Sequence, residues 1–254
     1  MRATGVVLAG SRPGGDPLAR THGTDLKALI PVAGVAMVRR PVEALLASPL
    51  VGRVLVLSQQ QERIAHALPA EERLSVECSG KTIAATLEAM CFDPDIQWPL
   101  LVTTADHALL NTAMIEDFLA RAKGADIAIG VVERRALIER LPQSERTWLR
   151  FRGGAYSGAN LFLLGGPRVV SALELWRSIE QDRKKAWALL WELGPLAFLG
   201  AALRLRTIGQ TAARIGRRLG LEVRAVELAD PLAAVDVDKQ ADLLLAEAIL
   251  EGRE

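Results

Sequence analysis

Residues that could bind phosphate lie near the start of the sequence, where an apolar run ends in a glycine-rich loop at residues 6–15. The run predicts a buried strand, and the loop predicts a turn whose backbone lies close to a ligand. Glycine lacks a Cβ atom, so its amide groups can converge on an anion. Arg12 and Lys27 add positive charge beside the loop. We therefore expect a phosphate-bearing ligand here, with a simple turn as the alternative.

Two common phosphate-binding loops do not fit this stretch. A dinucleotide fingerprint needs glycine at its third position, where Arg12 stands. A P-loop needs lysine after its second glycine, and here Asp16 follows Gly15. A later Gly-Lys-Thr at residues 80–82 lacks the leading glycine of a P-loop, because Ser75 occupies that position. The opening loop is therefore of neither type.

Acidic residues in two places are candidates for a metal site. Asp106 directly follows the apolar run at residues 100–104, and Asp236 and Asp238 lie two apart in a late extended segment. Residues at this spacing in a strand point the same way. Mg²⁺ prefers carboxylates together with substrate phosphates. We expect Asp106 and one of these two later aspartates to hold Mg²⁺; a turn role for Asp106 and a helix cap at Asp238 are the simpler alternatives.

Strand and helix patterns alternate along the first half of the chain. Strands are expected at residues 5–9, 53–57, 74–77, 100–104 and 126–132, and helices at 37–47, 60–67, 81–91 and 111–123. This alternation predicts an α/β fold in three layers, with a mainly parallel Rossmann-like sheet between helices. Ligands of such sheets bind at the carboxyl ends of the strands. The glycine loop and Asp106 are therefore predicted to lie at the same edge.

The composition is that of a protein with one substantial core. Half of the 254 residues are hydrophobic, which predicts a single domain over residues 1–254. The formal net charge of +1 gives no overall attraction to nucleic acid. Cys78 and Cys91 have no metal-binding or redox spacing, and no signal peptide is apparent. We therefore expect a cytoplasmic protein.

Four segments, in order, resemble a known superfamily. They are Leu8-Ala9-Gly10 with its loop, residues 27–34, residues 104–107 and residues 235–243. Together they are similar to nucleotidyltransferases of the molybdenum cofactor guanylyltransferase-like superfamily, which have a GT-A-type fold. The resemblance covers residues 3–132 and 220–251, with a matching strand at 157–164.

The resemblance implies roles for individual residues. The implied catalytic residues are Lys27, Arg12 and Asp106, and Lys27 would reach the α-phosphate. The glycine-rich loop of the superfamily contains an arginine, and both Arg12 and Arg20 are candidates for that position. Asp106 and Asp238 would bind Mg²⁺, with Asp236 as the rival for the second position. Nucleotide binding is implied for Leu8, Ala9, Gly10, Ser11, Gly14, Gly15, Ser79, Gly80 and Thr86, and Gly158 and Asn160 would lie on the acceptor side.

A segment at residues 165–225 has no counterpart in the resemblance. It carries eleven Arg or Lys against five Asp or Glu, and residues 186–203 are almost continuously apolar. We expect a helical, basic and apolar insertion at about 165–220. Three interpretations stay open. The segment could form helices of the core or of a homodimer interface, or a lid over a lipid-like acceptor. In the third, residues 183–218 contact the inner face of an anionic membrane peripherally.

The resemblance implies a Mg²⁺-dependent enzyme that transfers a nucleotide monophosphate (NMP) from a nucleoside triphosphate (NTP) to a phosphorylated acceptor and releases pyrophosphate. CTP and GTP are the expected donors, and the acceptor is a small or lipid-like molecule. No protein nucleophile is needed, because positioning and charge neutralisation accelerate phosphoryl transfer. Two alternatives stay open. One is an inactive nucleotide-binding regulatory or scaffold protein, and the other is a GT-A glycosyltransferase that uses Asp236 and Asp238.

Overall fold

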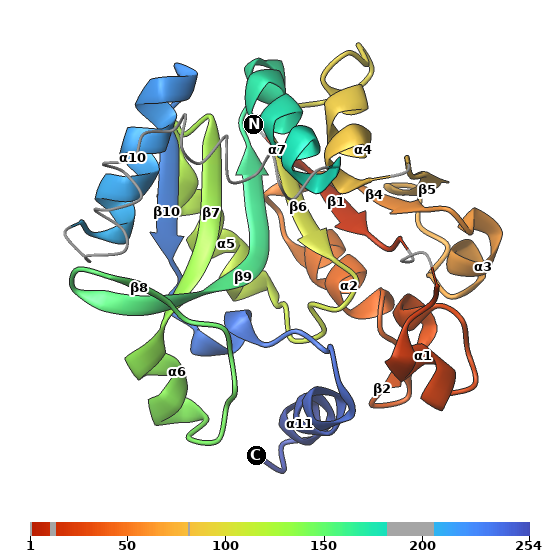
Figure 1. Ribbon diagram of the computed structural model, residues 1–254. Coiled ribbons are helices and arrows are strands. Elements are labelled where there is room, and N and C mark those ends of the chain that lie inside the picture. Colours follow the sequence, from red (N-terminus) through yellow and green to blue (C-terminus); the bar gives the residue numbers. More distant parts are fainter. Residues whose placement is uncertain (1, 11–13, 81, 182–205) are drawn as a thin grey trace.

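The computed structural model describes residues 2–10, 14–80, 82–181 and 206–254. Within these residues, one eight-stranded sheet has helices on both faces (Figure 1). Its strands are β1 (Ala3–Leu8), β4 (Val51–Ser58), β5 (Leu74–Cys78), β6 (Leu100–Thr104), β7 (Ile127–Glu133), β8 (Leu149–Phe151), β9 (Gly154–Leu164) and β10 (Val223–Glu227). A separate small hairpin pairs β2 (Pro31–Val32) with β3 (Val35–Ala36). The predicted three-layer α/β/α fold is confirmed.

The order of the strands is β10-β7-β9-β6-β1-β4-β5, with β8 paired to β9. β1 is parallel to both β4 and β6, and the pairs β4–β5 and β7–β10 are also parallel. β9 is antiparallel to both β6 and β7, and so it divides the parallel strands into two groups. Each expected strand is present, and the sheet is mainly parallel as predicted.

The helices form the two outer layers. They are α1 (Pro17–Thr21), α2 (Arg39–Ala47), α3 (Gln61–His66), α4 (Ile83–Met90), α5 (Thr112–Ala122), α6 (Arg134–Arg140), α7 (Val170–Gln181), α10 (Ile208–Leu219) and α11 (Gln240–Leu250), with short 3₁₀ turns η1 (Lys27–Leu29), η2 (Pro167–Val169) and η3 (Pro231–Ala234). α2 and α5 cover one face, and α4 and α7 cover the other (Figure 1). No helix of the described residues is long and apolar enough to cross a membrane.

The central strand β1 shows why the sheet is a middle layer. Val6 packs into the core beneath α4 and α7, whereas Val7 packs into the core beneath α2 and α5. Side chains of a strand alternate between faces, so a strand covered on both faces is apolar at consecutive positions. This accounts for the unbroken apolar run that opens the sequence.

Local signals set the ends of several helices. Thr82 accepts a hydrogen bond from the amide of Ala85 at the start of α4, and Asn111 accepts one from Met114 at the start of α5. Such caps satisfy amides that have no partner inside the helix. α7 and α10 lie in the expected helical insertion, and residues 182–205 between them lie outside the described part.

Candidate functional site

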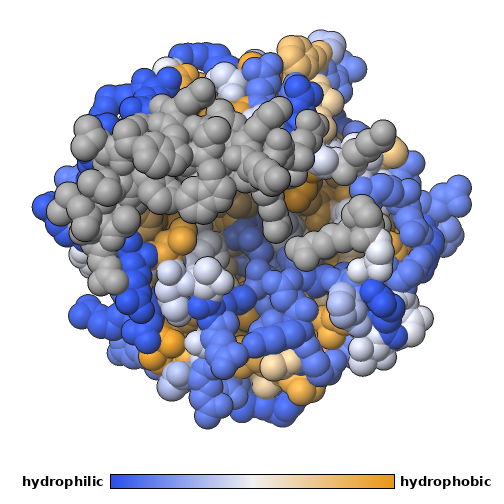
Figure 2. Space-filling model, viewed as in Figure 1, coloured by the Kyte–Doolittle hydropathy of each residue, from blue (hydrophilic) through white to orange (hydrophobic). Residues whose placement is uncertain are grey.

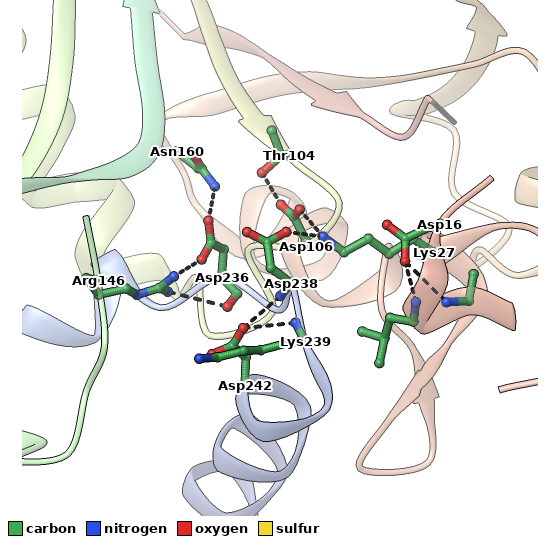
Figure 3. Close-up of polar contacts among 12 residues, drawn as sticks. Asp16, Lys27, Thr104, Asp106, Arg146, Asn160, Asp236, Asp238, Lys239 and Asp242 are labelled. Atoms are coloured by element: carbon green, nitrogen blue, oxygen red, sulfur yellow. Dashed lines mark hydrogen bonds and ion pairs between the residues drawn. The ribbon is translucent and has the colours of Figure 1, made fainter. Parts of the chain in front are cut away.

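Three predicted site residues from distant parts of the sequence meet at the carboxyl edge of the sheet (Figure 3). The Lys27 Nζ atom lies 2.7 Å from Asp106 Oδ2 and 2.5 Å from Asp238 Oδ1. These contacts span 79 and 211 residues of sequence. In the space-filling view the face of the molecule is hollowed near its centre (Figure 2). The three residues can therefore act on one ligand.

Lys27 is held as a cation in this arrangement. Burial lowers its pKa, but the charges of Asp106 and Asp238 and their hydrogen bonds outweigh that effect, so the pKa lies above its usual value. The flanking residues Leu26 and Ala28 are buried, which fixes the backbone of η1 beneath the site. Lys27 thus presents a permanent positive charge on a fixed backbone.

Asp106 is positioned by the end of β6. Its Oδ1 atom accepts a 2.5 Å hydrogen bond from the hydroxyl of Thr104, the last residue of that strand. The amide of Ala105 donates to the carbonyl of Leu8, which joins the ends of β6 and β1. Asp106 therefore lies beside the start of the glycine loop, as the sequence predicts.

Asp238 is brought to the site by the segment that precedes α11. The amide of Val237 donates to the Asp106 carbonyl at 3.0 Å, which ties the two aspartate-bearing segments together. Asp238 does not cap α11, contrary to one of our interpretations. Lys239 is the N-cap residue, and the Asp242 carboxylate accepts hydrogen bonds from the amides of Asp238 and Lys239. This arrangement leaves the Asp238 carboxylate directed at Lys27 (Figure 3).

Asp236, the rival metal ligand, lies in a different network. Its carboxylate pairs with Arg146 and accepts a 2.9 Å hydrogen bond from the side-chain amide of Asn160. Burial raises the pKa of Asp236 above its usual value, and the charges of Asp238 and Asp106 add to this, whereas Arg146 opposes it. The contacts described for Asp236 are thus with Arg146 and Asn160, whereas Asp238 contacts Lys27.

The predicted acceptor residues Gly158 and Asn160 both lie on β9. The pairing of β9 with β7 shifts register between Ile129 and Val131, and Asn160 has a φ of 45°. Positive φ is unusual for a residue other than glycine, although asparagine tolerates it better than most, and bulges redirect side chains. A Cβ atom built at Gly158 would meet no heavy atom of the described residues within 4 Å, its two chain neighbours aside. β9 thus turns Asn160 toward Asp236 and leaves space at Gly158.

The glycine loop continues from β1, which ends at Leu8. The Ala9 amide donates to Leu57 at 2.9 Å, and Gly14 and Gly15 have φ values of 91° and 75° that favour glycine. The guanidinium of Arg20 donates to the Gly14 carbonyl at 3.0 Å. Asp16, which stands where a P-loop has lysine, caps α1. The predicted residues Ser11 and Arg12 lie outside the described residues, whereas Gly10 follows β1 at the same edge.

The residues predicted to bind the base lie at the carboxyl end of β5. The Gly80 amide donates to Thr86 Oγ1 at 2.9 Å, and this hydroxyl donates to the Thr82 carbonyl at 2.8 Å. A Cβ atom at Gly80 would lie 3.1 Å from Thr86 Oγ1, so glycine suits the close approach. Ser79 Oγ is buried with no hydrogen-bond partner in the described part of the chain. These three residues form one structured corner at the end of β5, which β4 separates from β1.

The donor set at the site is compatible with Mg²⁺ that arrives with phosphates. Over the described ranges, no group of three or more His, Cys, Asp or Glu side chains could hold a metal ion. Asp106 and Asp238 nevertheless approach the same ammonium group. Mg²⁺ commonly uses one or two carboxylates, with phosphates and water as its other ligands. The pair could therefore hold Mg²⁺ together with a nucleotide.

A second hollow lies at the opposite edge of the sheet. This cavity of about 920 Å³ is lined by residues at the amino ends of β4 and β5, including Arg53 and Ser75, and by Trp98. Open α/β sheets bind ligands at the other edge, where the carboxyl ends of their strands lie. We therefore assign the functional site by the convergence of Lys27 with the two aspartates, and not by cavity size.

Sequence reasoning missed one residue of this site. Arg146 lies in the connection between α6 and β8, in no helix, strand or motif that would single it out. Its contact with Asp236 spans 90 residues of sequence. Only the surplus of polar residues in that connection could have drawn attention to it.

Comparison with known proteins identifies the family to which this chain belongs. The model of the MobA-like NTP transferase domain matches residues 5–207. A hypothetical transferase from Thermus thermophilus is 30% identical, with a TM-score of 0.80, over 96% of this chain and 100% of that one. A comparison with curated proteins finds no match.

Two more distant structures share the fold. A 4-diphosphocytidyl-2C-methyl-D-erythritol synthase from Anaerococcus prevotii is 8% identical over 98% of this chain and 96% of its own, with a TM-score of 0.62. A CMP:2-keto-3-deoxy-manno-octonic acid synthetase complexed with CTP is 12% identical over the whole of both chains, with a TM-score of 0.60. With the family match and the site geometry, these findings lead to one conclusion: the chain is a nucleotidyltransferase that belongs to the MobA-like NTP transferase family.

Proposed function

We propose that this enzyme transfers an NMP group from an NTP to a phosphorylated acceptor, with Mg²⁺ held by Asp106 and Asp238. The observation that carries the proposal is the contact of Lys27 with both carboxylates beside the glycine loop. The family match supports NTP as the donor. The distant relative complexed with CTP supports CTP as a first candidate, with GTP as the second.

The reaction can be written with ordinary nucleotidyl chemistry. A phosphate oxygen of the acceptor attacks the α-phosphorus in line, the bond from that phosphorus to the β-phosphate oxygen breaks, and pyrophosphate leaves. Lys27 neutralises charge that develops on the α-phosphoryl oxygens. Backbone amides near Gly10, Gly14 and Gly15 hold the triphosphate. Mg²⁺, when bound, would polarise the phosphoryl group and stabilise the leaving group.

Asn160 and Gly158 are the proposed boundary of the acceptor side. Asn160 is held by its bond to Asp236, and Gly158 leaves open space on the same strand. Arg146 neutralises Asp236, which reduces repulsion between that carboxylate and an anionic acceptor. The acceptor is therefore expected to be a phosphomonoester.

Pyrophosphate release tests the proposal. The protein is incubated with each of the four NTPs, Mg²⁺ and a panel of phosphomonoesters. We expect release that needs one NTP and one acceptor together. Lys27→Ala and Asp106→Ala should each lower the rate by about 10²–10³-fold, because they remove charges that act on the transition state. Full activity in either variant contradicts the role given to that residue.

Matched control variants remove the same residue types elsewhere. Asp25→Asn changes an aspartate that pairs with Arg63 on the surface, and Lys123→Ala changes a lysine at the end of α5. Both should keep the wild-type rate. If no NTP and acceptor pair yields pyrophosphate, while nucleotide binding is retained, the regulatory alternative replaces this proposal.

A further inference from the structure

The ammonium group of Lys27 lies between the carboxylates of Asp106 and Asp238, in the position that a bound cation would take. Its Nζ atom contacts Asp106 Oδ2 and Asp238 Oδ1 at 2.7 and 2.5 Å. The side chain of Lys27 is only 18% exposed and that of Asp106 is 22% exposed, whereas that of Asp238 is 59% exposed, so the contact with Asp106 is the shielded one. Charges that are partly shielded from water interact more strongly than charges on an open surface. The ammonium group therefore competes with any metal ion for these oxygen atoms.

Both carboxylate oxygens of Asp106 already accept a hydrogen bond. The Oδ2 atom accepts from Lys27, and the Oδ1 atom accepts from the Thr104 hydroxyl at 2.5 Å. Mg²⁺ binds a carboxylate oxygen at about 2.0–2.1 Å. An ion bound at Oδ2 would therefore lie beside the Lys27 ammonium group, and repulsion between the two cations favours displacement of that group.

The backbone around the site is fixed, but the lysine side chain can move. Val237 is bonded to the Asp106 carbonyl, so the two aspartate-bearing segments keep their spacing. Leu26 and Ala28 are buried on either side of Lys27. The four-carbon stem of lysine nevertheless allows its ammonium group to move without a change in the backbone. A nearby triphosphate would offer that group a replacement anion.

From this geometry we propose that Lys27 keeps the carboxylate pair closed to divalent metal until a triphosphate draws its ammonium group away. The inference rests on the proposed function, because it takes Asp106 and Asp238 as the metal ligands. Metal and nucleotide then bind with positive coupling, and each raises the affinity for the other by the same factor. The free protein has weak affinity for the metal alone.

The test measures metal affinity without nucleotide and without turnover. Mn²⁺ is titrated into the protein, and free Mn²⁺ is followed by electron paramagnetic resonance. Lys27→Met should bind Mn²⁺ at least about tenfold more tightly than the wild type, because the competing cation is gone. Lys27→Gln serves as a second variant, and circular dichroism verifies that both are folded.

Lys239→Met is the matched control for general electrostatics. Lys239 follows Asp238 directly and pairs with Glu145 at 3.1 Å. Its removal takes away the same charge near the site but leaves the contacts of Lys27 intact. We expect it to change Mn²⁺ affinity less than about twofold, because exposed charges are screened. Equal tightening in Lys27→Met and Lys239→Met overturns the inference.

The outcomes also separate this inference from the proposed function. If wild type and Lys27→Met bind Mn²⁺ equally and Asp106→Asn abolishes that binding, the metal site stands and the inference fails. If Mn²⁺ binding survives Asp106→Asn unchanged, the ligand assignment itself is wrong and both fail. Tightening in Lys27→Met that disappears when Asp106→Asn is added supports both.

Discussion

His107 is a buried polar residue directly after the aspartate that contacts Lys27. Its side chain is fully buried, and its Nδ1 atom lies 3.1 Å from the hydroxyl of Thr103. Burial lowers its pKa to about 4, although the neighbouring charge of Asp106 acts in the opposite direction. The ring is therefore neutral over most of the pH range in which the protein is folded.

This burial predicts that stability depends on pH. The folded pKa lies below the ordinary value of 6.5, so the unfolded chain binds the proton more tightly. The neutral His107 side chain contributes up to about 3 kcal/mol to the free energy of unfolding. This contribution is fully present above about pH 6.5 and is lost as the pH falls toward about 4. Urea unfolding of wild type and His107→Gln between pH 7 and 4.5 measures it. The wild type should lose stability more steeply with falling pH; parallel curves would contradict the prediction.

Strand ends and the resemblance together were enough to predict the central contacts. The carboxyl edge of the sheet was expected to hold the glycine loop and Asp106, and the resemblance implied that Lys27 and Asp238 act with them; the three residues do meet. Asn160 was expected near the acceptor, but its bond to Asp236 was not foreseen. A contact between residues far apart in the sequence leaves no local pattern, which is also why Arg146 went unnoticed.

At the scale of elements, the segment between η3 and α11 is held by the Asp236 network. Arg146 and Asn160 reach Asp236 from the connection before β8 and from β9. The side chains of Arg146 and Asp236 are only 13% and 22% exposed. The loss of one partner of such a pair leaves a poorly solvated charge.

Arg146→Met should therefore destabilise the fold by about 2–3 kcal/mol, somewhat below the value for a fully buried pair. The free energy of unfolding in urea measures the effect. Adding Asp236→Asn removes the charge that was left without its partner, so the double variant should recover part of the loss. A loss below about 0.5 kcal/mol in Arg146→Met would mean that the pair does not hold this segment.

The sequence did not reveal the direction of strand β9 in the sheet. The resemblance implied a strand at residues 157–164, and β9 is that strand. The pattern of side chains is the same for either direction, so it could not show that β9 runs antiparallel to β6 and β7. The short strand β8, which pairs with β9 in antiparallel fashion, has too few residues to produce a periodic signal in the sequence.

At the scale of the whole molecule, the larger core lies between the sheet and the helices α2, α5 and α11. Phe118 of α5 is completely buried in it, whereas Phe92 is 70% exposed. Large-to-small substitutions in a packed core lose transfer energy and leave a cavity. The two phenylalanines therefore form a matched pair for a test of the layer arrangement.

Phe118→Ala should lower the free energy of unfolding by about 3–5 kcal/mol. Phe92→Ala should change it by less than about 1 kcal/mol, since little of its surface is removed from water on folding. Chemical denaturation of both variants compares them directly. Similar effects at the two positions would contradict the assignment of α5 to the inner layer.

One carboxylate of the proposed site comes very late in the chain, in the segment that Val237 joins to Asp106. During synthesis, the glycine loop, Lys27 and Asp106 leave the ribosome long before Asp238 does. A nascent chain that has not reached residue 238 therefore has Lys27 and Asp106 but lacks Asp238. The contact of Lys27 with Asp238 forms only after the residues of its contact with Asp106 have been made.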